Sequence, residues 1–369
     1  MTNIIRQLGV IAVLLLAAVI ATSGVAPIST DKSPVPDKAS KKCESTKRAR
    51  EFAAAPYYTG LLFDGHLHLP STSGTVSSIA KKIGLPQPAW DKELSLESLN
   101  CLFEAEGVGR AYSFHLITKY SAGSEVAMAK KMNKLYPRRF VHFLMPTMVS
   151  PWINPSLETV TKILEKNPGL FKGLGELKMF DGKSPNDPFL IGLYDLAKKY
   201  GLVVMMHPFG NHLGAVEDVV KRYPEVKFLF HSIDRINGKT MREDVDNMEW
   251  VMNLIRDYPN VYYSVDSIVP IYGYRPEHMD KEVSKESTLL YVRENFEDIL
   301  EEQVSRWKRR IQTYPDRFVW GTDRWHRPHF DPAVSALVAE ISRSFIGQLD
   351  PAVREKYAHK NAEGLLEAK

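Results

Sequence analysis

Two histidines one residue apart, His66 and His68, end an apolar stretch at residues 61–69. Side chains alternate between the faces of a β-strand, so both imidazoles would point to the same side. Two neutral imidazoles on one face, at the end of a buried strand, can bind one metal ion. A pair of hydrogen-bonded histidines is the alternative, because a His-x-His pattern alone has little specificity.

Histidine or carboxylate residues also end four other apolar stretches: Glu176, His207, His231 and Asp323. The chain contains eight such apolar stretches, and each has the pattern of a β-strand. They lie at residues 61–69, 110–117, 139–146, 171–179, 201–209, 227–232, 261–268 and 318–323. The segments between and after them predict helices, at residues 94–106, 128–135, 155–166, 189–200, 213–223, 248–257, 281–314, 332–345 and 351–366.

Eight strands that alternate with helices predict parallel β/α units. The number of strands favours a closed (β/α)8 TIM barrel over an open, doubly wound α/β sheet. No glycine-rich phosphate loop follows the first strand, which disfavours a nucleotide-binding sheet. Chemistry in such barrels gathers at the C-terminal ends of the strands. We therefore expect the five strand ends that carry His, Glu or Asp to form one site at the barrel mouth.

Imidazole and carboxylate ligands suit zinc, iron or manganese, and the absence of cysteine ligands argues against a closed structural zinc site. Three or four protein ligands leave a position for water, and the metal lowers the pKa of that water. Asp323 could accept its proton, and His231 could act as a general acid or polarise a substrate carbonyl. We expect one or two divalent metal ions, with Zn²⁺ preferred.

Four motifs on these strands resemble the amidohydrolase superfamily, and specifically the amidohydrolase-related branch that includes aminocarboxymuconate-semialdehyde decarboxylase. The motifs are D-G-H-L-H at 64–68, H-P after V-V-M-M at 203–208, F-H-S at 230–232 and W-G-T-D at 320–323. The closing segment A-H-K-N-A-E-G-L-L at 358–366 is similar to the last helix of that branch.

The resemblance spans residues 61–366. It implies a metal-dependent TIM-barrel enzyme in which His231 has a catalytic role close to the metal. The implied metal ligands are His66, His68, His207 and Asp323.

The fourth strand offers two candidate ligands. G-L-G-E-L at 173–177 is similar to a segment of the metal-dependent deoxyribonuclease-like branch, where the Glu binds a metal, and this favours Glu176 and a second ion. Other branches place a carboxylated lysine on this strand, and Lys178 shares a face with Glu176. An internal salt bridge is the purely structural alternative. A two-metal site would hydrolyse its substrate, whereas a one-metal site leaves decarboxylation open.

Residues just beyond the strand ends are candidates for substrate contact, because they would form the loops over the site. Arginines among them could clamp a carboxylate or phosphate, although a surface salt bridge is the alternative for each. The candidates are Arg235, Tyr272, Arg275, Trp325 and Arg327. For His115 and His142, within the second and third strands, we expect hydrogen bonding in the core rather than metal binding.

The N-terminal segment at residues 1–26 has the pattern of a secretory signal peptide or N-terminal anchor, because Arg6 precedes an apolar run and small residues follow. Residues 27–55 predict a disordered basic linker, and residues 56–369 the barrel domain. We expect export, to the periplasm or out of the cell, with the first segment either cleaved or retained. Cys43 and Cys101 could form a bridge in an oxidising compartment, but two unpaired thiols are the default expectation.

The 369-residue chain has a net charge of +4. Seven basic and three acidic residues at positions 26–50 account for this excess, so the barrel domain is close to neutral. This argues against nucleic-acid binding. The basic tail could contact an anionic membrane surface, with a solvated linker as the alternative, and assembly into a homo-oligomer is left open.

The expected function is that of an exported metal-dependent hydrolase, in which a metal-activated water cleaves a small organic substrate such as an amide, ester or lactone. One alternative is non-hydrolytic decarboxylation of an aromatic or unsaturated carboxylic acid. The second alternative is a non-catalytic binding module that keeps a metal for structure.

Overall fold

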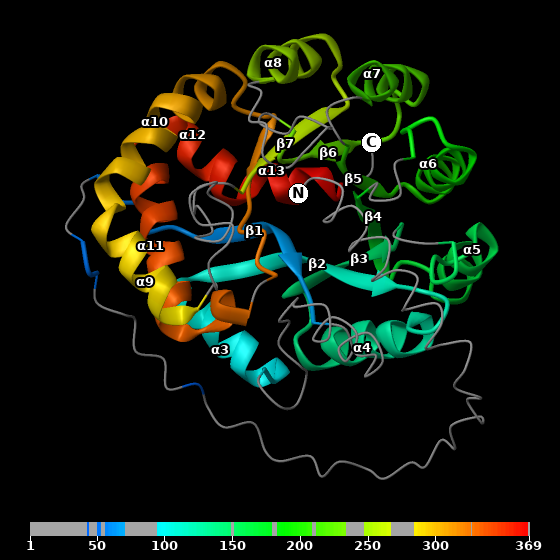
Figure 1. The fold of residues 1–369 in the computed structure, drawn as a ribbon, viewed down its shortest axis with the longest axis horizontal. Coiled ribbons are helices and arrows are strands. Elements are labelled where there is room, and N and C mark those ends of the chain that lie inside the picture. The colour runs from blue at the N-terminus through cyan, green and yellow to red at the C-terminus, as the bar shows by residue number, and fades with distance from the viewer. Residues whose placement is uncertain are drawn as a thin grey trace, which may run out of the picture.

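The computed structural model describes Cys43 and residues 50–52, 56–70, 94–148, 151–178, 183–208, 212–233, 247–266, 284–325 and 327–367. In these ranges eight parallel strands form one sheet in the order β1 to β8 (Figure 1). The strands are β1 (Leu62–His68), β2 (Val108–Ile117), β3 (Phe140–Pro146), β4 (Phe171–Lys178), β5 (Val203–His207), β6 (Phe228–Phe230), β7 (Val261–Val265) and β8 (Phe318–Trp320). All eight predicted strands are confirmed.

The barrel closes where the end of β8 meets β1. Leu67 forms a parallel bridge with Arg324, and the amide of His68 donates to the carbonyl of Arg324 at 3.1 Å. The (β/α)8 prediction is therefore confirmed, and the seam runs through the His66–His68 pair.

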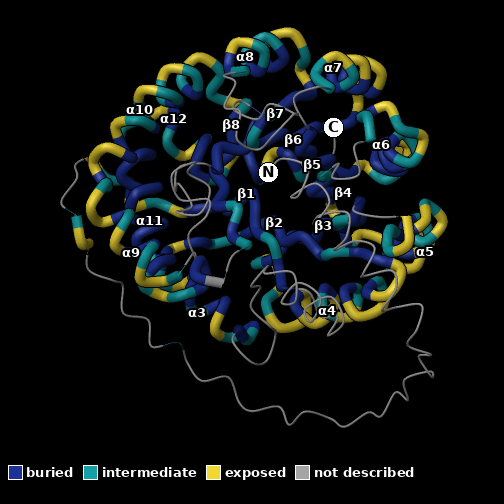
Figure 2. The backbone as a smooth tube through the Cα atoms, viewed as in Figure 1, coloured by how far each residue is buried: buried dark blue, intermediate teal, exposed yellow. Residues whose placement is uncertain are grey.

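Helices surround the strands and turn their apolar sides inward, so that exposed residues lie on the outer rim (Figure 2). They are α3 (Leu96–Glu106), α4 (Ala122–Leu135), α5 (Leu157–Lys166), α6 (Pro188–Tyr200), α7 (Leu213–Arg222), α8 (Met248–Asp257), α9 (Lys285–Glu294), α10 (Phe296–Thr313), α11 (Pro332–Gly347), α12 (Pro351–Glu355) and α13 (Asn361–Leu365). Two further turns are η4 (Arg327–Phe330) and η5 (Lys356–Lys360). The predicted helix at 281–314 is two helices, separated at Asn295.

Local sequence signals explain several helix ends. The hydroxyl of Ser95 accepts from the amide of Ser98 at the start of α3, and Gly107 ends this helix with φ 70°. Asp187 caps α6, which has a proline in its first turn and ends at Gly201 in the left-handed conformation. Side-chain caps satisfy amides that have no partner within the helix, and glycine adopts positive φ without strain.

The centre of the barrel is packed with apolar side chains and closed below by the C-terminal helix. Phe63, Phe143 and Met205 belong to this inner cluster, and Ala362 and Leu365 of α13 pack against it. Figure 1 shows α13 across the centre of the barrel. Asn361 of α13 donates to the carbonyl of Phe318 at the start of β8, so α13 lies at the N-terminal ends of the strands. The candidate ligands gather at the opposite ends.

The chain before β1 is attached to the barrel. A disulfide joins Cys43 to Cys101 of α3, so the expectation of two unpaired thiols is wrong. Phe52 stacks on Phe296 of α10, and its amide donates to Glu340 of α11 at 2.7 Å. Residues 50–52 of the predicted linker thus contact the barrel. Residues 1–26 lie outside the described ranges, and within those ranges no helix has the length and hydrophobicity needed to span a membrane.

A buried ion pair joins α3 to the segment after β8. Arg324 donates to the carboxylate of Glu106 at 2.8 Å and to the hydroxyl of Ser335 at 2.6 Å. Both charged side chains are 1% exposed. Removing one member of such a pair leaves the other charge buried without compensation.

We predict that Glu106→Ala lowers the free energy of unfolding by about 3–5 kcal/mol, the cost of an unpaired buried charge. Glu301→Ala, at an exposed position on α10, is the matched control and should change it by less than about 0.5 kcal/mol. Urea unfolding measures both. Equal stabilities of the two variants would contradict the prediction.

His115 and His142 lie on the outer side of the barrel wall, as expected for core histidines. His115 Nε2 is 2.9 Å from His142 Nδ1, and His115 Nδ1 is 3.4 Å from Glu125 of α4. Both rings contact Phe171 of the outer core. Burial, and then the neighbouring His115, lowers the pKa of His142 to about 2.

This depressed pKa predicts a loss of stability in acid. Between about pH 6.5 and pH 2, His142 is protonated in the unfolded chain but stays neutral in the folded protein. The free energy of unfolding should fall by about 1.4 kcal/mol per pH unit from this group. His142→Gln should flatten the dependence between pH 6.5 and 5. Identical pH slopes for the variant and the unaltered protein in urea unfolding would refute it.

Candidate metal centre

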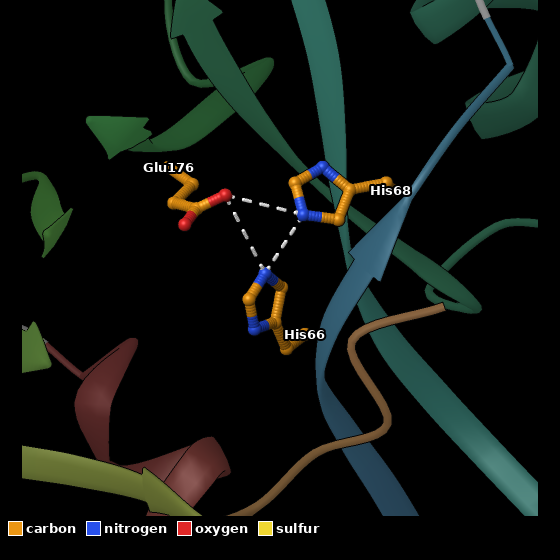
Figure 3. Close-up of side chains that lie close together, drawn as sticks. All are labelled: His66, His68 and Glu176. Carbon is orange, nitrogen blue, oxygen red and sulfur yellow. Dashed lines mark hydrogen bonds and ion pairs between the residues drawn. The ribbon is translucent and has the colours of Figure 1, made fainter. Parts of the chain in front are cut away.

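Three of the residues expected to bind metal meet at the C-terminal ends of β1 and β4 (Figure 3). The Nε2 atoms of His66 and His68 are 3.0 Å apart. Oε2 of Glu176 lies 3.2 Å from His68 Nε2 and 3.9 Å from His66 Nε2. Ligand atoms from two strands thus converge on one point.

Asp323 completes this first donor group from the end of β8. Its Oδ1 lies 3.3 Å from His66 Nε2 and 3.2 Å from His68 Nε2. Asp323 has a φ of 47°, and left-handed backbone at a residue other than glycine is characteristic of functional sites. The backbone approaches β1 closely here, because a Cβ at Gly321 would lie 3.0 Å from that of His66.

His207 and His231 form a second donor group around the other oxygen of Glu176. His207 Nδ1 is 2.7 Å and His231 Nε2 is 2.5 Å from Oε1. Glu176 therefore belongs to both groups, one at each carboxylate oxygen. The resemblance implied one ligand group with His231 beside it, whereas the structure brings together two groups that share a carboxylate.

The backbone of β4 explains how Glu176 reaches this position. Gly175 has a φ of 131°, and a Cβ there would lie 2.4 Å from the carbonyl oxygen of Met205 on β5. Only glycine allows this approach between the strands. Lys178, the other candidate ligand, has its Nζ 3.8 Å from Glu176 Oε1 as an ion-pair partner. The geometry favours Glu176 as the ligand and Lys178 as a neighbouring positive charge.

Asp266 is a site residue that the sequence analysis missed. Its Oδ2 accepts from His66 Nδ1 at 2.8 Å and lies 3.2 Å from His231 Nδ1. It directly follows β7, at the end of the stretch predicted at 261–268. A carboxylate at a strand end was the signal available, because the other site residues occupy the same kind of position.

The charges in the site compensate one another. Burial raises the pKa of Glu176. The positive charges of Lys178 and His231 outweigh this effect and hold the pKa well below its usual range. Burial lowers the pKa of His68, but the adjacent carboxylates of Asp323 and Glu176 outweigh this and raise it to about 8. The carboxylates therefore remain ionised and hold positive charge beside them.

The donor atoms fit a divalent cation. Oε2 of Glu176 is buried and accepts no hydrogen bond from the described residues. His66 donates through Nδ1 to Asp266, so a neutral His66 directs the lone pair of Nε2 towards the carboxylates of Asp323 and Glu176. Electron pairs facing one another in this way are stabilised by a positive ion between them. Imidazole and carboxylate ligands suit zinc and related metals.

The predicted substrate residues are not tested by this arrangement. Arg235, Tyr272 and Arg275 lie outside the described residues. The side chain of Arg327, at the start of η4, is likewise outside them. Trp325 is half-buried two residues after Asp323, and its amide donates to His329 Nδ1 at 3.4 Å. Substrate contact by these five residues stays a prediction.

Comparison with known proteins assigns the chain to a family. The family model described as amidohydrolase matches residues 121–367. The chain belongs to the amidohydrolase family. A search of curated proteins found no match. The family assignment and the eight-stranded barrel identify the protein as an amidohydrolase-family TIM-barrel enzyme.

Three solved structures are similar to this amidohydrolase-family chain, and the first of them supports its fold. An amidohydrolase from Burkholderia multivorans with bound Zn is 13% identical, with a TM-score of 0.54 over 83% of this chain and 99% of the other. A probable 2-pyrone-4,6-dicarboxylic acid hydrolase from Acinetobacter baumannii is 13% identical, with a TM-score of 0.49 over 83% and 98%. The 5-carboxyvanillate decarboxylase LigW from Sphingomonas paucimobilis is 12% identical, with a TM-score of 0.48 over 84% and 99%.

We predict that the double variant His66→Ala/His68→Ala loses bound divalent metal, because it removes two ligands of the first donor group. His359→Ala, on η5, is the matched control and should retain the metal. Elemental analysis of the purified proteins measures the metal-to-protein ratio. Equal metal content in all three proteins would show that the ions bind elsewhere.

Proposed function

We propose that this amidohydrolase-family protein is an exported metal-dependent hydrolase of small organic substrates that carry an amide, ester or lactone bond. The observation that carries the proposal is the position of Glu176, whose two oxygens face two separate groups of ligand atoms. A carboxylate placed in this way suits a site for two ions, and such sites activate water for hydrolysis.

Zn²⁺ is the metal that we propose for both positions. The first would be held by His66, His68, Asp323 and Glu176, and the second by Glu176, His207 and His231. When bound, the metal supplies a Lewis acid and lowers the pKa of water. The remaining chemistry depends on the protein's own groups.

Asp323 is suited to transfer the proton. Its side chain is 21% exposed, whereas that of Glu176 is fully buried. One oxygen faces the His66–His68 pair, which leaves the other for a proton taken from water and passed to the leaving group. His231 is fully buried between Glu176 and Asp266, which favours ligation and orientation over direct contact with substrate.

The export part of the proposal has support from the N-terminal pattern and from the bond between Cys43 and Cys101. Disulfides persist in the periplasm and outside the cell and are rare in the cytosol. Thiol titration of the denatured protein, isolated from its native compartment, should detect no free thiol without a reductant and two thiols per chain after reduction. Two free thiols before reduction would argue against export.

We predict that Asp323→Asn lowers kcat by about 10²- to 10⁴-fold on the best substrate found among esters, lactones and amides, because the group that accepts the proton is lost. The metal content of the variant is measured in parallel, since Asp323 is also a ligand. Asp316→Asn, an exposed aspartate paired with Lys356, is the control and should retain full activity.

Reaction in ¹⁸O-labelled water separates the two enzymatic functions. Hydrolysis incorporates one labelled oxygen into the carboxylate product. Release of carbon dioxide from an aromatic or unsaturated acid, without incorporation of label into the organic product, would establish the decarboxylase alternative. Absence of activity in a metal-loaded protein across both substrate sets, with unchanged ligand affinity in His231→Ala, would favour the binding module.

A further inference from the structure

We propose that Asp266 is a positioning residue. One oxygen of its carboxylate keeps the proton on Nδ1 of both His66 and His231, and so orients one ligand in each donor group for metal binding. This inference rests on the proposed metal centre. It assigns a role to the end of β7, the strand that contributes no ligand to either donor group.

Two contacts identify the arrangement: a hydrogen bond from His66 and an ion-pair contact with His231. Oδ2 of Asp266 lies 2.8 Å from Nδ1 of His66 and 3.2 Å from Nδ1 of His231. The side chains of both histidines are fully buried, and that of Asp266 is 3% exposed. Water therefore does not compete for these contacts. An ionised carboxylate only accepts hydrogen bonds, so Nδ1 of His66 carries the proton. At Nδ1 of His231 a lone pair would face the same carboxylate oxygen at 3.2 Å, which favours the proton there as well.

The opposite ring nitrogens then become the ligand atoms. Nε2 of His66 faces His68 and Asp323 in the first donor group. Nε2 of His231 lies 2.5 Å from Glu176 in the second donor group. A hydrogen bond to one nitrogen of a histidine fixes its tautomer and orientation for metal binding through the other. Asp266 performs this function for one ligand of each group.

The two rings are also packed against each other. The ring centroids of His66 and His231 are 4.3 Å apart with an interplanar angle of 82°. On its other side His231 packs edge-on against His207, at 4.4 Å and 78°. A rotation of either ring about its bond to Cβ would disturb its neighbour, so one anchor at Asp266 orients a contiguous set.

The backbone at Asp266 is itself held in place. The preceding carbonyl, of Val265, accepts from the hydroxyl of Tyr357 at 3.3 Å. Tyr357 is a fully buried residue of η5. The C-terminal segment thus holds the end of β7 through this hydrogen bond. Asp266 follows Val265 directly, and its side chain contacts the two histidines.

The test combines metal titration with a measurement of the ring nitrogens. Metal-free protein is titrated with Zn²⁺ by calorimetry, for the unaltered protein, Asp266→Asn and Asp266→Ala. We expect the affinity of both ions to fall about 10- to 100-fold in both variants. Asp257→Asn, at the exposed end of α8 in the preceding segment, is the matched control and should bind Zn²⁺ like the unaltered protein.

Ring ¹⁵N spectra of histidine-labelled, metal-free protein give the second readout. In the unaltered protein, Nδ1 of His66 and of His231 should both be protonated. In Asp266→Ala this preference should be lost at His66, and in Asp266→Glu, which keeps the negative charge, it should be restored at least in part. A residue needed only for stability would not change which ring nitrogen carries the proton. The isosteric Asp266→Asn serves if Asp266→Ala does not fold.

The outcomes separate this inference from the proposed function. If the unaltered protein binds no Zn²⁺, the metal centre itself fails. If the unaltered protein binds Zn²⁺ and a folded Asp266→Asn binds it with equal affinity, the metal centre stands and the role of Asp266 is refuted. A loss confined to one ion, or unchanged ring nitrogens in a folded variant, also refutes it.

Discussion

Burying the carboxylate of Glu176 is costly unless other groups compensate its charge and satisfy its oxygens. Histidines from three strands and the ammonium of Lys178 surround it, and the barrel must close with β1, β5 and β6 in register for them to do so. The metal-binding geometry, the low pKa of the carboxylate and the tight contact between β4 and β5 all follow from this requirement. A divalent cation would satisfy the same oxygens, which is why this buried carboxylate suits a metal centre.

The seam between β1 and β8 provides the base for this arrangement. Asp64 accepts hydrogen bonds from the amides of His66 and Thr322 and from the hydroxyl of Thr322, at 2.6–3.1 Å. Burial raises the pKa of Asp64 to about 6, although Arg324 and these hydrogen bonds act in the opposite direction. The contacts join the motifs D-G-H-L-H and W-G-T-D. Asp64 and Thr322 therefore position the candidate ligands of these two motifs, His66, His68 and Asp323.

Local sequence patterns were sufficient to predict most of the fold. All eight strands and most helices follow from the alternation of apolar runs with helical periodicity, because each element buries one face or stripe. The break between α9 and α10 at Asn295 was missed, since helical periodicity continues on both sides of it. The pairing of Cys43 with Cys101 was not predicted either, because it depends on where the tail meets α3.

For the site, the sequence was sufficient to identify the ligand types and the barrel mouth where they meet. His66 and His68 share a face because side chains alternate between the two faces of a strand. Glu176, His207, His231 and Asp323 each end a predicted strand, and the C-terminal ends of all strands meet at one face of a parallel barrel. Only the tertiary structure decided which atoms meet: the two oxygens of Glu176 face different histidines, and Asp266 serves two rings that are 165 residues apart. These contacts depend on strand register, on the bend at Gly175 and on ring orientation, which arise from long-range packing rather than from local periodicity.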